Sequence, residues 1–159
     1  MSQGSSTSHD SGVAYLQRAF DLAKMAMRRQ EVPVGAVLVF EDGQIFESGN
    51  ERERQKRVNH HCEALIIDRA SQTRQQWRLE KSTLFVTLEP CLMCTGLIYA
   101  SRIPRVVYGC DNPKGGALRF VQRHRKDLGL NHSVRIESGI LEEEIQNLMK
   151  AFFEPLRHK

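Results

Sequence analysis

Three segments of this chain are almost entirely apolar and rich in β-branched residues. They read VGAVLVF (34–40), TLFVTL (83–88) and RVVYG (105–109). Apolar runs of this length are typical of strands that are covered on both faces of a sheet. Because helical patterns lie before, between and after them, we expect an α/β fold. It should be a three-layer α/β/α sandwich around a mixed sheet of about five strands.

The segments around these strands supply the helices and the remaining strands. Apolar residues recur at helical spacing over residues 13–30 and predict an amphipathic helix that Pro33 ends. Residues 41–43 predict a turn, so a returning hairpin strand is expected over residues 44–48. Pro90 suits the first position of a helix, where its missing N–H costs nothing. Further helices are expected over residues 61–70, 90–100, 118–128 and 141–152. The remaining strand is expected over residues 134–137.

The chain is expected to form one domain with a short tail. Its 159 residues suffice to bury one core, and no internal repeat divides them. The first residues, MSQGSSTSHDSG, are rich in Ser and Gly and lack the apolar stretch of a secretory signal. We therefore expect a flexible N-terminal tail over residues 1–12 and one domain over residues 13–159. No apolar run is long enough to cross a bilayer, so a cytoplasmic protein with reduced cysteines is expected.

Two of the four cysteines, Cys91 and Cys94, are three residues apart directly after Pro90. On the expected helix both thiols face one side, and the positive helix end favours their thiolate forms. A redox dithiol, half of a structural zinc site and two ligands of a catalytic metal all satisfy this spacing. An all-cysteine structural site would also need Cys62 and Cys110. Cys110, however, ends an apolar strand and is expected to be a small buried side chain.

A second motif, HCE (61–63), favours the catalytic metal. It also lies where a helix is expected to begin, so two helix N-termini can converge on one ion. A catalytic zinc site uses three protein ligands and leaves one position to water, and His61, Cys91 and Cys94 supply those three. Glu63 is then free to carry protons near the metal. H-x-E followed by P-C-x-x-C is the signature of zinc-dependent base deaminases.

Basic residues cluster in three places, although the formal net charge of +4 does not by itself indicate nucleic-acid binding. The clusters lie at residues 52–57, 123–126 and 157–159. They are either a solvated face or contacts for the phosphates of a nucleic acid. A free nucleobase offers no phosphates, so the clusters favour a polymeric substrate.

With these motifs, the chain resembles the bacterial tRNA-specific adenosine deaminases of the cytidine/deoxycytidylate deaminase superfamily. These enzymes convert the wobble adenosine of a tRNA anticodon to inosine. The resemblance covers nearly the whole chain, from about residue 13 to residue 157. Besides HCE (61–63), it rests on EVPVGAVLV (31–39), GN (49–50), TLFVTLEPCLMC (83–94), SRIPRVVYG (101–109), PKGG (113–116), NHSVRI (131–136) and FFxxLR (152–157).

The resemblance implies a cytidine-deaminase-like fold and a homodimer with one Zn²⁺ per subunit. The partner would be the anticodon stem-loop of a tRNA, with no membrane and no nucleotide cofactor involved. His61, Cys91 and Cys94 would hold the zinc, and Glu63 would pass protons to and from the adenine ring. The implied substrate contacts are Asn50, Val32, Leu88 and the backbone of Cys62.

The chain also departs from the family pattern. Family members usually read PTAHAE where this chain reads VNHHCE (58–63), and have Asp where this chain has Asn112. They commonly have Gly-Ser after the glycines, where this chain reads ALRF (117–120). Two alternatives therefore stay open. One is a deaminase of a free nucleobase or nucleoside, such as guanine, cytosine or adenosine, on the same scaffold. The other is a zinc-stabilised RNA-binding module without catalysis, against which the unliganded Glu63 argues.

Overall fold

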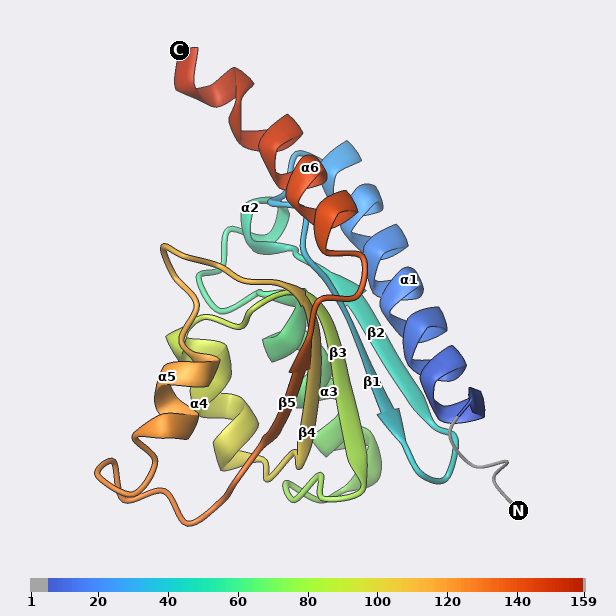
Figure 1. Cartoon of the computed structure of the whole chain (residues 1–159), viewed down its shortest axis with the longest axis vertical. Coiled ribbons are helices and arrows are strands. Elements are labelled where there is room, and N and C mark those ends of the chain that lie inside the picture. Colours follow the sequence, from blue (N-terminus) through green and yellow to red (C-terminus); the bar gives the residue numbers. More distant parts are fainter. Residues whose placement is uncertain (1–5, 159) are drawn as a thin grey trace.

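The computed structural model describes residues 6–158 and places a five-stranded sheet at the centre of the molecule (Figure 1). The strand order is β2-β1-β3-β4-β5. β1 pairs antiparallel with β2 and β3, whereas β3, β4 and β5 run parallel. The expected mixed sheet of about five strands is confirmed. The strands are β1 (Gly35–Phe40), β2 (Ile45–Gly49), β3 (Ser82–Leu88), β4 (Arg105–Cys110) and β5 (Arg135–Ser138).

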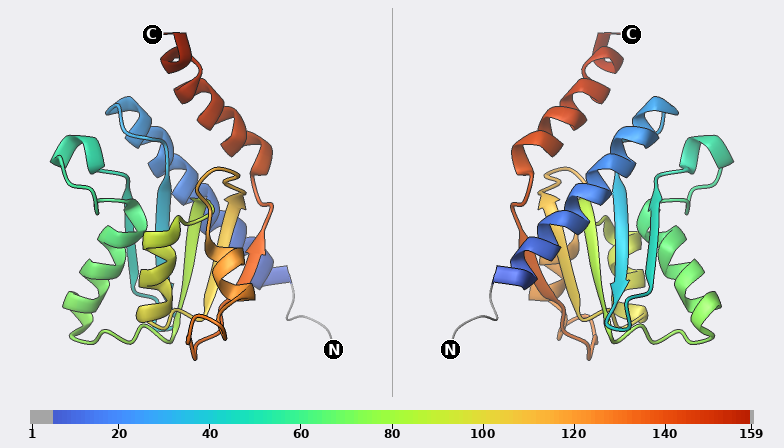
Figure 2. Two further views of the ribbon diagram at one scale, coloured as in Figure 1. Left: turned by 90° about the vertical axis from the view of Figure 1, so that its left-hand side faces the viewer. Right: turned by 90° about the vertical axis from the view of Figure 1, so that its right-hand side faces the viewer.

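Helices cover both faces of this sheet (Figure 2). α1 and α6 contact one face, while α3 packs on the other beside α4, which in turn contacts α5. The expected three-layer arrangement is therefore confirmed. The helices are α1 (Ser6–Arg28), α2 (Arg52–Gln55), α3 (Cys62–Arg74), α4 (Leu92–Ala100), α5 (Leu118–Arg123) and α6 (Glu142–Phe153), followed by the 3-10 turn η1 (Pro155–His158).

α1 lies unusually close to the sheet because small residues face each other where the two meet. A side-chain carbon added at Gly35 of β1 would lie 2.0 Å from the backbone oxygen of Ala19 in α1. Around this contact, Leu16 of α1 packs with Val37 and Phe85 of the sheet. This close packing holds the segment between α1 and β1 in place, and part of that segment lines the functional site.

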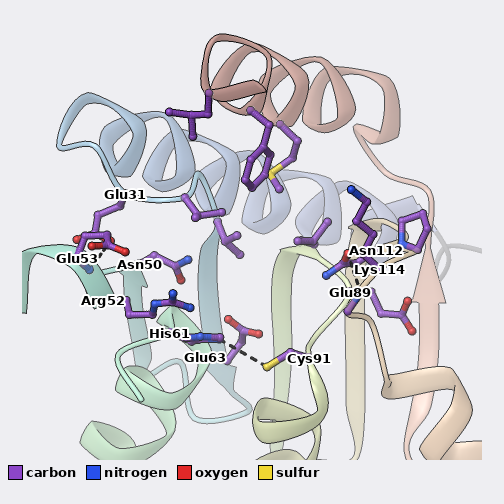
Figure 3. Close-up of a pocket in the computed structure, with 18 of the residues that line it drawn as sticks. Glu31, Asn50, Arg52, Glu53, His61, Glu63, Glu89, Cys91, Asn112 and Lys114 are labelled. Atoms are coloured by element: carbon purple, nitrogen blue, oxygen red, sulfur yellow. Dashed lines mark hydrogen bonds between the residues drawn. The ribbon is translucent and has the colours of Figure 1, made fainter. Parts of the chain in front are cut away.

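The opposite face carries the larger core and sets the position of the chemistry. Ile66 of α3 and Ile98 of α4 are fully buried against Leu84 and Val86 of β3. α3 contacts β1 and β2 and lies beside α4, and the N-termini of the two helices lie at one edge of the sheet (Figure 3). This is the edge at which the parallel strands β3 and β4 end, the usual location of ligand sites in open α/β sheets.

Several boundaries differ from the expectations. α1 begins at Ser6, inside the tail expected over residues 1–12, and residues 1–5 of that tail lie outside the described part. Pro90 precedes its helix, because its carbonyl accepts the Ala117 N–H at 2.9 Å and Cys91 is the extended N-cap. The polar loop after β2 contains the short helix α2, which no pattern predicted. Among residues 6–158, no helix is long and apolar enough to span a membrane.

Candidate active site

The first residues of α3 and α4 meet and form the centre of the site (Figure 3). His61 is the N-cap of α3 and Cys91 the N-cap of α4, and neither side chain caps its own helix. Both side chains instead turn toward each other, with Cys91 Sγ 3.6 Å from His61 Nδ1. Cys94, in the first turn of α4, places its Sγ 3.7 Å from the same nitrogen. The three residues expected to bind metal are thus brought together within 4.8 Å.

The donor set fits a zinc ion. Zinc bonds of about 2.3 Å to sulfur and about 2.0–2.1 Å to nitrogen, at tetrahedral angles, hold the two donor atoms about 3.6 Å apart. The two sulfur–nitrogen distances, 3.6 and 3.7 Å, match this value. Two thiolates and one imidazole are also typical zinc ligands, and a set of three leaves one coordination position for water.

The two thiols, Cys91 and Cys94, shift each other's pKa in a way that favours binding of a cation. The hydrogen bond with Cys94 lowers the pKa of the Cys91 thiol to about 4, and His61 acts in the same direction. The same contact with Cys91, together with burial, raises the pKa of Cys94. The pair therefore gives up its first proton readily and its second only when a cation offsets the added charge.

Glu63 lies beside this triad as a buried carboxyl group. Its residue is 4% exposed, and burial raises the pKa of the carboxyl. The neighbouring Cys62 thiol, whose own pKa is raised well above its ordinary value by burial, donates a hydrogen bond to Glu63 Oε1 at 2.9 Å. Glu63 does not belong to the group of donor atoms that could hold a metal. It is placed to accept and return a proton next to that group.

A cavity of about 720 Å³ opens above His61, Glu63 and Cys91. Three of the four expected substrate contacts line it, namely Val32, Asn50 and Leu88. The fourth was the backbone of Cys62. In the structure its N–H donates to Asn50 Oδ1 at 2.9 Å, while the Cys62 side chain is fully buried outside the lining. Asn50 is thereby fixed in orientation by the first residue of α3.

Cationic side chains surround the mouth of the cavity, but only two of the three basic clusters contribute. Arg52, Lys114 and Arg157 line it. None of residues 123–126, all of which the structure describes, does so. This run begins at the last residue of α5, and His124 stacks on Phe120 of that helix. Spacing in the sequence could not distinguish these clusters, because their relation to the cavity depends on how the elements pack.

Several residues that line the cavity were not expected from the sequence. Met149, Phe153 and Leu156 reach the cavity from α6 and η1, and Glu31 and Glu89 from its two sides. The sequence marked Glu31 only as the first residue of the segment EVPVGAVLV (31–39), three residues before the apolar run of β1. The apolar stripe of α6 predicted a helix. It did not predict which apolar residues of that helix the sheet would leave uncovered. Met149 and Phe153 are among these residues.

The structure also shows where the residues that depart from the family pattern lie. Asn112 lines the cavity, and its Oδ1 accepts the Gly115 N–H at 3.2 Å. Arg119 is turned toward the sheet, where its Nε donates to the Tyr108 hydroxyl at 2.5 Å and its Nη2 donates to Ser138 Oγ at 2.8 Å. Cys110 is 4% exposed in β4, as expected for a small buried side chain outside the metal group.

Comparisons with known proteins agree with this geometry. The family model of the MafB19-like deaminases matches residues 10–157. The tRNA-specific adenosine deaminase of Bacillus subtilis (strain 168) is 43% identical over 145 residues, which cover 91% of this chain and 90% of the relative.

Solved structures agree as well. One from a study of A-to-I editing by tRNA:A34 deaminases at the wobble position of transfer RNA superposes with a TM-score of 0.78 at 37% identity. The match covers 85% of this chain and 98% of that one.

A solved guanine deaminase from Nitrosomonas europaea shares the fold alone. It is 16% identical, with a TM-score of 0.71, and the match covers 88% of this chain and 83% of that one. The cytidine-deaminase-like fold that the resemblance implies is confirmed by the superposition with the tRNA:A34 deaminase structure. The chain therefore belongs to the MafB19-like deaminase family and, within it, to the tRNA-specific adenosine deaminases.

Proposed function

We propose that this protein is a zinc-dependent hydrolase that deaminates adenosine to inosine at the wobble position of a tRNA anticodon. The observation that carries the proposal is the His61, Cys91 and Cys94 group beside the buried Glu63 at the base of the cavity. The 43% identity to a tRNA-specific adenosine deaminase supports the choice of substrate. A tRNA substrate supports the cytoplasmic location that the sequence leads us to expect.

The metal would be held by His61, Cys91 and Cys94, one Zn²⁺ per chain. When bound, zinc supplies Lewis-acid activation of a water molecule at neutral pH. The chain itself supplies the proton transfer. Glu63 can take a proton from the attacking water and deliver it to a ring nitrogen of the base, which makes the ring carbon electrophilic. Glu63, again a carboxylate, can then take the second proton from the hydroxyl group that the water has added to the ring carbon. It passes this proton to the amino group, which leaves as ammonia while the carbonyl of inosine forms.

The cavity walls suit a flat, extruded base. Val32 and Leu88 offer apolar surfaces in the lining, and Asn50 offers an amide held by the Cys62 N–H. A base in an RNA loop must leave its stack to reach a buried site, and its flanking phosphates then remain at the mouth. Arg52, Lys114 and Arg157 supply positive charge there, which supports a polymeric substrate over a free base.

We further propose that the protein acts as a homodimer, as the resemblance implies. Exposed apolar side chains lie on α4 and α5, where Leu92 is 69%, Met93 37% and Phe120 59% exposed. An unpartnered apolar surface of this kind favours association. Sedimentation equilibrium tests the proposal: Leu92→Glu should shift a dimeric wild type toward monomer, and a wild type that is monomeric at micromolar concentration contradicts it.

A panel of substrates tests the proposed reaction. The zinc-loaded protein is incubated separately with an anticodon stem-loop carrying adenosine at the wobble position, and with free adenosine, guanine and cytosine. The account predicts inosine in the stem-loop at a rate that far exceeds turnover of every free compound. Fast turnover of guanine or another free base, with the stem-loop unchanged, would show that the scaffold serves a small-molecule deaminase.

A further inference from the structure

The carboxylate of Glu31 is buried at the side of the cavity and has no part in the proposed chemistry. The residue is 1% exposed and follows the end of α1. Its Oε2 accepts the backbone N–H of Glu53 at 3.0 Å, and its Oε1 accepts that of Arg54 at 2.6 Å. A buried carboxylate is tolerated where hydrogen bonds to its charge replace water, and these two bonds do so.

The helix that receives these bonds has little else to hold it. α2 has four residues and none of them is buried, and its N-cap Glu51 gives no side-chain capping bond. A single helical turn is not stable alone, because its N–H groups lack partners and its nucleation is costly. The bond from the Glu51 N–H to the His60 carbonyl closes the loop on itself without tying it to the sheet. Glu31 therefore acts as a capping residue supplied from a distant part of the chain.

α2 begins with Arg52, whose side chain lies over His61 and points into the cavity (Figure 3). We propose that Glu31 is a positioning residue, which holds α2 so that the Arg52 guanidinium meets a phosphate beside the extruded nucleotide. The inference rests on the proposed RNA substrate and deepens it. It assigns the grip on that phosphate to a cation placed by a buried carboxylate, not to a freely moving surface side chain.

Glu31→Gln is the informative change. The amide keeps the size of the side chain but has one acceptor oxygen, so its NH2 group would face one of the two backbone N–H groups. The Michaelis constant for the stem-loop should rise about three- to tenfold, the scale of one ordinary hydrogen bond, with little change in kcat or bound zinc. The salt slope of stem-loop binding should fall by about 0.7, the value for one phosphate contact on a single strand. Backbone N–H groups of residues 53 and 54 should exchange hydrogen faster.

Two further variants make the test specific. Glu47→Gln is a matched control, because Glu47 also accepts two hydrogen bonds, from Arg18, but does not line the cavity. It should leave the Michaelis constant and the salt slope unchanged. In an Arg52→Ala background, Glu31→Gln should add nothing to the effect on the Michaelis constant, because both changes remove the same contact. Should Glu31→Gln fail to fold, Glu31→Asp keeps the charge, draws it back by one methylene group and should show the same changes.

Each outcome separates this inference from the proposed function. A wild type that deaminates no stem-loop refutes the function and, with it, the assignment of a phosphate contact. A wild type that deaminates the stem-loop, with an unchanged Michaelis constant and salt slope in Glu31→Gln, refutes the inference alone. Unchanged hydrogen exchange at residues 53 and 54 also refutes it, as does a further rise in the Michaelis constant in the Arg52→Ala background.

Discussion

Glu63→Gln separates proton transfer from every other property of the site. The change replaces one carboxyl oxygen by an amide nitrogen and alters the volume little. The remaining oxygen can still accept the Cys62 thiol, which lies 2.9 Å from Oε1. Because Glu63 is outside the group of metal-binding atoms, bound zinc should be unchanged.

The expected loss of rate follows from the role of the carboxyl group. General acid–base catalysis by one positioned side chain contributes about 10²- to 10⁴-fold, or about 2.7–5.4 kcal/mol of transition-state stabilisation. Stability should change in the opposite direction. Burial raises the pKa of this carboxyl, so its charged form is disfavoured, and a neutral amide removes that cost. Glu63→Gln should therefore unfold at the same temperature as the wild type, or at a higher one.

The assay measures inosine formed in the anticodon stem-loop under single-turnover conditions. Zinc content and the unfolding temperature are measured on the same preparation. A rate within about tenfold of the wild type, less than the contribution of one acid–base group, would show that another residue carries the proton. If the deamination rate falls as expected but bound zinc falls with it, Glu63 instead helps to hold the metal.

Three other changes test separate parts of the structure. Cys94→Ala should lose bound zinc and activity together, whereas Cys110→Ala should retain both; metal analysis that gives the reverse result contradicts the ligand set. Gly35→Ala forces a methyl group to within 2.0 Å of a backbone oxygen of α1, so the free energy of unfolding in urea should fall by about 1–3 kcal/mol or more, and an unchanged midpoint contradicts the close packing. The hydrogen bond and charge of Arg18 lower the pKa of Glu47. The ion pair therefore stabilises the folded state fully at a pH above the pKa that Glu47 has in the unfolded chain. This stabilisation is lost as the pH falls through the lower pKa that Glu47 has in the folded state. Urea unfolding between about pH 5 and pH 3 should thus depend less on pH in Glu47→Gln than in the wild type, and equal dependence contradicts the pairing.

The parts of the molecule that the sequence predicted well are those recorded in local patterns. The apolar run ending at Leu88 identifies a buried strand, because few other elements tolerate such a segment. The HCE and PCLMC motifs predict two converging helix starts, because three zinc ligands and a free carboxyl have few other uses in that order. The local pattern wrongly predicted Pro90 as the first residue of a helix. The Pro90 carbonyl instead accepts the N–H of Ala117, in the loop before α5.

Long-range contacts account for what the sequence did not predict. Glu31 caps a helix more than twenty residues further along the chain, and no spacing rule connects a buried carboxylate with an exposed turn. The reach of Phe153 to the cavity depends on how α6 crosses the sheet. The basic run at 123–126 was indistinguishable from the cluster at 52–57 in composition. Only the packed structure shows that Arg52 of the 52–57 cluster lines the cavity, whereas no residue of the 123–126 run does.

We expect one metal ion, held by His61, Cys91 and Cys94, to enable deamination of a single adenosine in RNA. The decisive measurement is a stepwise zinc titration of the metal-free protein, with inosine mapped along an anticodon stem-loop. Inosine should form at the wobble position alone, in proportion to bound zinc and with a plateau at one ion per chain. Full activity in the metal-free protein, or a plateau of zinc binding without any inosine, would refute this mechanism.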